Sequence, residues 1–175
     1  MCIRFVNKIF AIFFLCLNPF NSLAIDNSLS ISKGQPTSEQ NKSISVQDLI
    51  YQQSITNILS REVSFGLMGR VGNIQVGSEQ GTRLGIGSYT LINLSPVTIS
   101  IPISILMLDK SGYGINEKAT KNYGGKLQFT YGMEVGYSIN HNWEVFYRFE
   151  HMSNANRYEY NPGLDSHNLG IKVNF

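Results

Sequence analysis

The sequence predicts an all-β protein, an eight-stranded antiparallel β-barrel that crosses a membrane. Three observations support this fold class. Large apolar residues alternate with small or polar residues along most of the chain after Arg61, which is the pattern of strands that lie between two different environments. The first residues have the character of an export signal. The charged residues of the alternating segments fall mostly on the face opposite the apolar residues.

Residues 1–24 have the features of a secretory signal peptide. Two basic residues, Arg4 and Lys8, come before an apolar run over residues 9–17, and small residues lead up to Ala24. We therefore expect cleavage after Ala24. A membrane anchor helix is the alternative, but the apolar run is shorter than the roughly 20 residues that a span requires.

Removal of this segment would change what the chain can bind. Both cysteines, Cys2 and Cys16, lie inside it, so the exported protein would have neither disulfides nor thiolate metal ligands. Lysines and arginines would fall from 14 to 12 against 12 acidic residues, which leaves no net charge. A neutral exported chain without a basic patch does not predict a nucleic-acid partner.

Residues 25–47 come before the regular alternation. They are rich in Ser, Asn, Gln and Lys, and we expect them to form a flexible lead-in to a barrel domain over residues 48–175. The segment 46–59 is compatible with a short helix or with a first strand, and we favour the strand.

Six strands can be placed from the alternation alone. In KLQFTYGMEVGYS, residues 126–138, every second residue is large and apolar and those between are small or polar. Two further strands must come from residues 29–59 or 109–125, and the second of these regions has the composition of a loop. The six predicted strands span residues 62–72, 80–90, 97–108, 126–138, 142–153 and 165–175.

The alternation fits a soluble barrel or a membrane barrel, which turn opposite faces outward. The strands are about 10–12 residues long, enough to cross a bilayer at a tilt, and aromatic residues cluster near strand ends as in membrane girdles. The polar face is charged, and those charges can pair inside a narrow lumen but would be unfavourable unpaired in an apolar core. The residues concerned are Glu134, Glu144, Arg148, Glu150 and Lys172. The pattern therefore favours a barrel in the outer membrane of a Gram-negative cell.

The apolar face that is expected to meet lipid ends in polar residues on two of the predicted strands. In the strand over 142–153 the apolar face continues into His151 and Ser153, and Asp165 is in phase with the apolar face of the last strand. Side chains at i and i+2 start about 6.6 Å apart, which lets an imidazole reach a serine hydroxyl. Antiparallel pairing across the 154–164 loop would bring Asp165 beside His151. These are the residue types of a nucleophile, a base and an orienting acid.

The same region allows other interpretations. A histidine and a serine at the end of a strand also suit a polar rim near the membrane interface. His167 is an alternative base, Glu159 is an alternative acid, and His141 in an Asn-His-Asn turn is expected to be solvated. The sequence has no zinc spacing, glycine-rich phosphate loop or nucleotide fingerprint, so we expect neither a metal nor a cofactor.

The sequence HMSNA at 151–155, followed by NPG at 161–163 and by Asp165, resembles the signature of the lipid A 3-O-deacylases, the PagL-type outer-membrane enzymes. The resemblance covers residues 126–175, and the rest of the chain matches only in barrel character. That family is an eight-stranded barrel whose Ser-His-Glu site faces the lipid. Two positions depart from it, because Asp165 stands where the family has Glu and Asn156 replaces a usual Gly.

The resemblance implies a serine esterase that hydrolyses the 3-O-linked 3-hydroxyacyl chain of lipid A. Ser153 would attack the ester carbonyl, His151 would take and return the proton, and Asp165 would orient His151. Asn161, or backbone N–H groups near Asn154, would hold the oxyanion.

The resemblance also implies a location and partners. The protein would lie in the outer membrane with lipopolysaccharide as its substrate, and a homodimer is one assembly that the sequence permits. Two other functions stay open at this point. One is a different outer-membrane lipid enzyme, a phospholipase or an acyltransferase, and the other is a non-catalytic structural or adhesion barrel.

Overall fold

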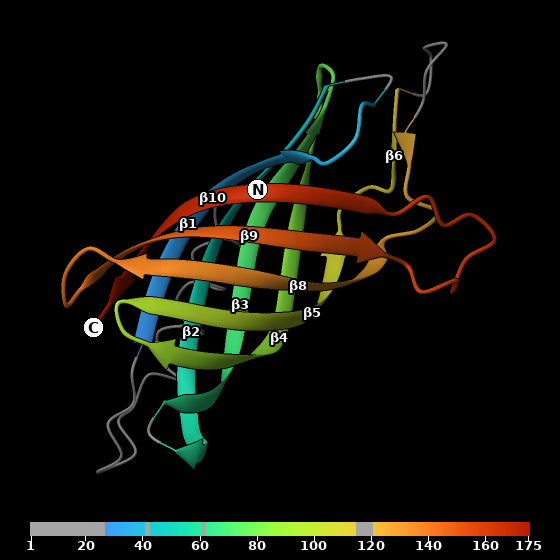
Figure 1. Ribbon diagram of the computed structural model, residues 1–175. Helices are drawn as coiled ribbons and strands as arrows, with labels where there is room; N and C mark the ends of the chain where they lie inside the picture. Colours follow the sequence, from blue (N-terminus) through green and yellow to red (C-terminus); the bar gives the residue numbers. More distant parts are fainter. Residues whose placement is uncertain (1–26, 41–42, 61, 115–120) are drawn as a thin grey trace, which may run out of the picture.

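The computed structural model describes residues 27–40, 43–60, 62–114 and 121–175; the signal peptide predicted for residues 1–24 lies outside them. Eight antiparallel strands close into one barrel in the order β1-β10-β9-β8-β5-β4-β3-β2, and a two-stranded hairpin, β6-β7, lies beyond one end of it (Figure 1). The strands are β1 (Asn27–Pro36), β2 (Ile44–Ser60), β3 (Val63–Val76), β4 (Glu79–Leu94), β5 (Val97–Leu108), β6 (Gly112–Tyr113), β7 (Lys121–Asn122), β8 (Leu127–Ser138), β9 (Trp143–Ser153) and β10 (Leu164–Asn174).

The barrel confirms the predicted fold class, and the six predicted strands are β3, β4, β5, β8, β9 and β10. The interpretation of residues 46–59 as a strand is confirmed by β2. The expected flexible lead-in over residues 25–47 is wrong, because residues 27–36 form β1 and pair with both β2 and β10. The barrel therefore begins well before residue 48, and β1 closes it.

The composition of β1 explains the error. Its inward side chains are serines, which are buried in the lumen, and only two of its outward side chains are aliphatic. A strand of this kind has a disorder-like composition although its alternation is regular. The inward residues are Ser28, Ser30 and Ser32, and the outward residues are Leu29, Ile31, Lys33 and Gln35.

The outer surface of the barrel is apolar across its middle. One cross-strand row takes one residue from each of the eight barrel strands, and every member is apolar: Val145, Ile171, Ile31, Leu49, Val71, Leu84, Met107 and Leu127. The next outward row, toward β6, is apolar on β9 and β10 but polar on β1–β4, where it holds Lys33, Gln47, Asn73 and Thr82. On β1–β4 the apolar surface expected to face lipid therefore ends at this row. None of the described residues forms a helix long and apolar enough to cross a membrane.

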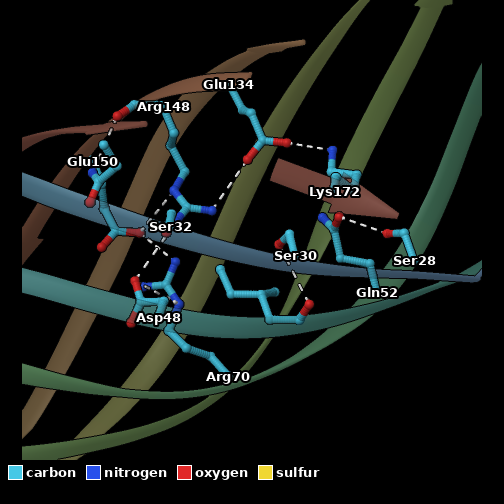
Figure 2. A network of polar contacts seen from close by, with 12 residues as sticks. Ser28, Ser30, Ser32, Asp48, Gln52, Arg70, Glu134, Arg148, Glu150 and Lys172 are labelled. Atoms are coloured by element: carbon cyan, nitrogen blue, oxygen red, sulfur yellow. Dashed lines mark hydrogen bonds and ion pairs between the residues drawn. The ribbon is translucent and has the colours of Figure 1, made fainter. Parts of the chain in front are cut away.

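The lumen is filled by charged side chains that pair with one another (Figure 2). Lys172 Nζ lies 2.6 Å from Glu134 Oε1 and 2.8 Å from Glu144 Oε1. The five charges that the sequence placed on the polar face all point inward and are buried. Three buried residues that the sequence analysis did not single out join them: Asp48, Arg70 and Arg83.

Apolar side chains close the barrel at the end where β6 lies. Tyr113 and Tyr123, which lie in and next to the β6-β7 hairpin, pack edge to face with ring centroids 6.1 Å apart. Burial raises the pKa of both phenols. Eight other residues complete this cluster: Ile44, Val46, Ile74, Val76, Leu106, Leu108, Met152 and Leu164. The hairpin is thus packed over the barrel end that also carries the loop after β9.

Candidate active site

His151 and Asp165 face each other across the ladder between β9 and β10. They are direct partners in a register that runs without a break from Leu164 to Val173. His151 Nδ1 lies 2.5 Å from Asp165 Oδ1, so the imidazole and the carboxylate are hydrogen bonded. Their side chains are 27% and 47% exposed, on the outer surface of the barrel. Aspartate, although shorter than glutamate, therefore reaches the ring from the position directly opposite.

Ser153 is the last residue of β9 and shares the outer face with His151. Alternation along the strand separates the two Cα atoms by about 6.6 Å. No hydrogen bond joins the two side chains in the part of the chain that the structure describes. Because Asp165 is hydrogen bonded to Nδ1, Nε2 is the ring nitrogen left for the serine hydroxyl. Hydrogen bonds between a catalytic base and its nucleophile often tighten only when substrate binds.

Tyr131 flanks the imidazole on its other side. It is the direct partner of His151 in the ladder between β8 and β9. The two rings are 5.0 Å apart at their centroids and tilted by 39°. His151 therefore lies between an aromatic ring on one strand and a carboxylate on the next. Tyr131 was not among the candidate residues in the sequence, and it could have been found only by counting the strand register back from the turn at 139–142.

Asn154 and Asn161 anchor the loop that follows Ser153. The Asn154 side chain is fully buried, and its Nδ2 donates to the carbonyl oxygens of Tyr123 at 3.1 Å and Tyr160 at 2.7 Å. The backbone N–H of Asn154 donates to Asn161 Oδ1 at 3.0 Å, and Asn161 Nδ2 donates to Asn156 Oδ1 at 3.0 Å. Both asparagines predicted near the oxyanion thus fix the loop beside the serine.

The backbone turns sharply directly after this point. Ala155 and Asn156 have positive φ values of 53° and 58°. Asparagine enters this region more readily than most residues with a side chain, which explains how Asn156 replaces the expected glycine. Among the described residues, the N–H groups of Ala155 and Asn156 donate to no acceptor. Two free donors therefore follow Ser153 in the chain.

His167 and Glu159, which the sequence left as alternatives, and His141 make no hydrogen bond to His151 among the described residues. His167 Nδ1 is hydrogen bonded to the hydroxyl of Tyr147 rather than to a carboxylate. Glu159 is exposed in the loop, and Asp165 is the one carboxylate within 4.0 Å of a His151 nitrogen among the described residues. His141 is exposed in the turn between β8 and β9, at the other end of the barrel. The structure thus brings together Asp165 and His151, and Ser153 follows His151 by two residues on the same face of β9.

The chemistry that this arrangement supports is acyl transfer through a serine. A histidine oriented by a carboxylate can take the proton of a serine hydroxyl, and free backbone donors can stabilise an oxyanion. Within the described ranges no three residues among His, Cys, Asp and Glu group closely enough to hold a metal ion.

Comparisons with known proteins point to one family. A family model described as lipid A 3-O-deacylase (PagL) matches residues 48–174. The crystal structure of the outer membrane enzyme PagL is similar with a TM-score of 0.62 and 16% identity, over 83% of this chain and 98% of that chain.

Other barrels share the fold. The N-terminal β-barrel domain of Pseudomonas aeruginosa OprF has a TM-score of 0.58 and 10% identity, over 86% of this chain and 97% of that chain. Yersinia pestis Ail, the attachment invasion locus protein, has a TM-score of 0.54 and 11% identity, over 87% of this chain and all of that chain, 100%. At such identities the likeness shows the fold alone. No curated protein matches the sequence significantly.

Proposed function

Because the chain belongs to the lipid A 3-O-deacylase (PagL) family, we propose that it hydrolyses the ester of the 3-O-linked 3-hydroxyacyl chain of lipid A. The observation that carries the proposal is the hydrogen bond between His151 and Asp165, beside Ser153, on the outer surface of a closed barrel. A site on this surface can meet a substrate that stays in the bilayer. All three residues come from one chain, so the proposal does not require a homodimer.

The proposed location is the outer leaflet of the outer membrane, after removal of residues 1–24. Membrane barrels of this kind have short periplasmic turns and longer external loops. The connection from β5 to β8 and the connection from β9 to β10 start and finish at the end of the barrel that carries Ser153, together with the short turn 77–78, and the short turns 95–96 and 139–142 lie at the other end. This arrangement supports a site that faces the lipopolysaccharide.

In the first half of the reaction, the Ser153 hydroxyl oxygen attacks the ester carbonyl carbon while His151 Nε2 accepts its proton. The Asp165 carboxylate stabilises the imidazolium that forms. The tetrahedral intermediate then collapses, the bond to the sugar oxygen breaks, and His151 returns the proton to that oxygen. The products are a free sugar hydroxyl and an acyl group on Ser153.

In the second half, water attacks the acyl-serine while His151 takes its proton. Collapse of this intermediate releases the 3-hydroxy fatty acid and returns the proton to Ser153. We assign the oxyanion to the unpaired N–H groups of Ala155 and Asn156, because Asn154 uses its own N–H within the loop. Asn161 holds these donors in place.

The acyl chains need an apolar surface next to the ester. A shallow groove of about 640 Å³ lies on the outer face of the barrel around β8, β9 and β10. Its nearest member on β9, Tyr147, is four residues from His151, so the groove lies on the same outer face as the site but closer to the turn at 139–142. It includes Val135, Tyr137, Val145, Tyr147, Leu169 and Ile171.

The proposal is tested by mass spectrometry of lipid A from Gram-negative cells that express the chain or its Ser153→Ala variant. We expect the loss of one 3-hydroxyacyl mass with the wild-type chain only. Heat-modifiable migration on gels controls for folding of both proteins. Altered phospholipids beside intact lipid A would indicate a different lipid enzyme, and no lipid change with folded protein would contradict an enzymatic role.

A further inference from the structure

The loop that follows β9 is held by residues 123–126, the segment that leads from β7 into β8. Both lie at the same end of the barrel (Figure 1). The side chain of Asn154 is fully buried, and its Nδ2 donates to the carbonyl oxygen of Tyr123 at 3.1 Å. The buried Gln128 of β8 donates to the same oxygen at 3.1 Å and to the carbonyl oxygen of Gly125 at 2.6 Å. The segment is therefore fixed to β8 on one side and to the loop on the other.

Two consecutive glycines allow the segment and the loop to approach each other closely. Gly124 has a φ of +80°, a backbone conformation that residues with a side chain rarely adopt. A Cβ atom at Gly124 would overlap the carbonyl oxygen of Tyr160 and would lie 2.6 Å from Asn154 Nδ2. A Cβ atom at Gly125 would overlap the ring of Tyr158. The two glycines therefore contact the loop both before and after its sharp turn.

The turn between these contacts has a backbone conformation that costs free energy. Ala155 and Asn156 have positive φ values, and residues with a side chain keep such values only where their surroundings fix them. The hydrogen bonds of Asn154 fix the chain before the turn, and the packing of Tyr158 and Tyr160 fixes it after the turn. The N–H groups of the two turn residues donate to no acceptor in the described part of the chain. Their direction therefore depends on the close contact with the two glycines.

We propose that Gly124 and Gly125 are positioning residues, which hold the backbone N–H groups of Ala155 and Asn156 toward the oxyanion. This inference rests on the proposed deacylation. The glycines act through the loop and not on the substrate, because a side chain at either position would push the loop away from β8. Negative charge develops on the ester oxygen in the transition state and not in the bound ester, so displaced donors weaken the stabilisation of the transition state. The loss then falls on kcat and leaves KM nearly unchanged.

Gly124→Ala tests the inference, with purified protein in nonionic detergent micelles and lipid A as substrate. We expect kcat to fall by about tenfold to a thousandfold, at most the effect of losing one oxyanion donor, while KM changes by less than about twofold. Heat-modifiable migration shows whether the barrel is folded. Gly112→Ala is the matched control and should keep the wild-type kcat. Gly112 lies in β6 of the same connection, and a Cβ atom there would meet no described atom within 4 Å.

A double-mutant cycle with Asn154→Ala distinguishes positioning from an unrelated loss of structure. Both changes act on the same loop, so the double variant should lose little more activity than the more damaging single variant. Losses of kcat that multiply would overturn the inference. A wild-type kcat in folded Gly124→Ala would overturn it too, and so would an equal loss in Gly112→Ala.

Gly125→Ala decides the question if Gly124→Ala does not fold. Its methyl group would meet the Tyr158 ring, which can move in part, so we expect a smaller loss of kcat, about two- to tenfold. An unchanged kcat in Gly125→Ala would then overturn the inference while the activity of the wild type still supports the proposed function. Folded wild-type protein that releases no acyl chain would contradict the proposed function itself and the inference with it.

Discussion

Replacement of Asp165 by asparagine keeps the shape of the side chain and removes its charge. In the proposed reaction His151 becomes an imidazolium, so the carboxylate stabilises the transition state more than the resting state. Its Oδ1 lies 2.5 Å from His151 Nδ1. For charge centres about 4 Å apart, the attraction is about 1 kcal/mol in water and about 4 kcal/mol near a protein surface.

The exposure of the pair decides where in this range the effect falls. The Asp165 side chain is 47% exposed and His151 is 27% exposed, so solvent screens the interaction in part. We expect Asp165→Asn to lower kcat by roughly fivefold to a thousandfold. The loss of about 10⁴-fold known for a buried aspartate in a protease triad is an upper limit.

The assay is release of the 3-hydroxy fatty acid from lipid A in detergent micelles, followed by mass spectrometry. Asp165→Glu should keep most of the rate, because it retains the charge and half-exposed surroundings give the longer side chain room to bend. Full activity of Asp165→Asn would refute the role of Asp165 in orienting His151. Glu159→Gln then becomes the variant to measure, since Glu159 is the other acid of that loop.

Three further outcomes are expected. Tyr131→Ala should lower kcat by roughly two- to tenfold, because the aromatic ring beside His151 contributes about 0.5–1.5 kcal/mol. Tyr131→Phe keeps the ring and should keep the rate, so equal rates for the two variants would contradict this role. Asn154→Ala removes two hydrogen bonds that anchor the loop, so limited proteolysis should cut residues 154–163 faster while the barrel still resists heat in detergent. Glu150→Gln leaves buried arginines with less counter-charge, and urea unfolding should show a loss of about 3–5 kcal/mol; an unchanged midpoint would contradict the pairing.

The alternation of residues made much of the barrel predictable. Glu134, Arg148 and Lys172 are unfavourable in an apolar core, so their phase indicated a polar lumen before any pairing was known. The strand β1 was not predictable in the same way, because serine serves equally well in a lumen and in a disordered segment. The buried charge of Asp48 was missed for a related reason. Without β1 as a neighbour, the sequence did not show which residues of β2 face the lumen.

The candidate site was predictable only in part. The phase of β9 and β10 placed His151, Ser153 and Asp165 on one face, because side-chain alternation is a local property. Tyr131 depends on the register between β8 and β9, which the turn sets. The buried role of Asn154 depends on packing against the segment near Tyr123, far away in the sequence. Contacts of this kind follow from the closed barrel rather than from any local pattern.

The central claim is that Ser153 on the lipid-facing surface cleaves an ester of lipid A. The most direct measurement is the amount of 3-hydroxy fatty acid released from purified lipid A by the wild type, Ser153→Ala and His151→Ala, with folding of each protein checked by heat-modifiable migration. We expect one chain released per lipid A molecule by the wild type and no release above background by either variant. Release by folded Ser153→Ala at the wild-type rate would contradict it.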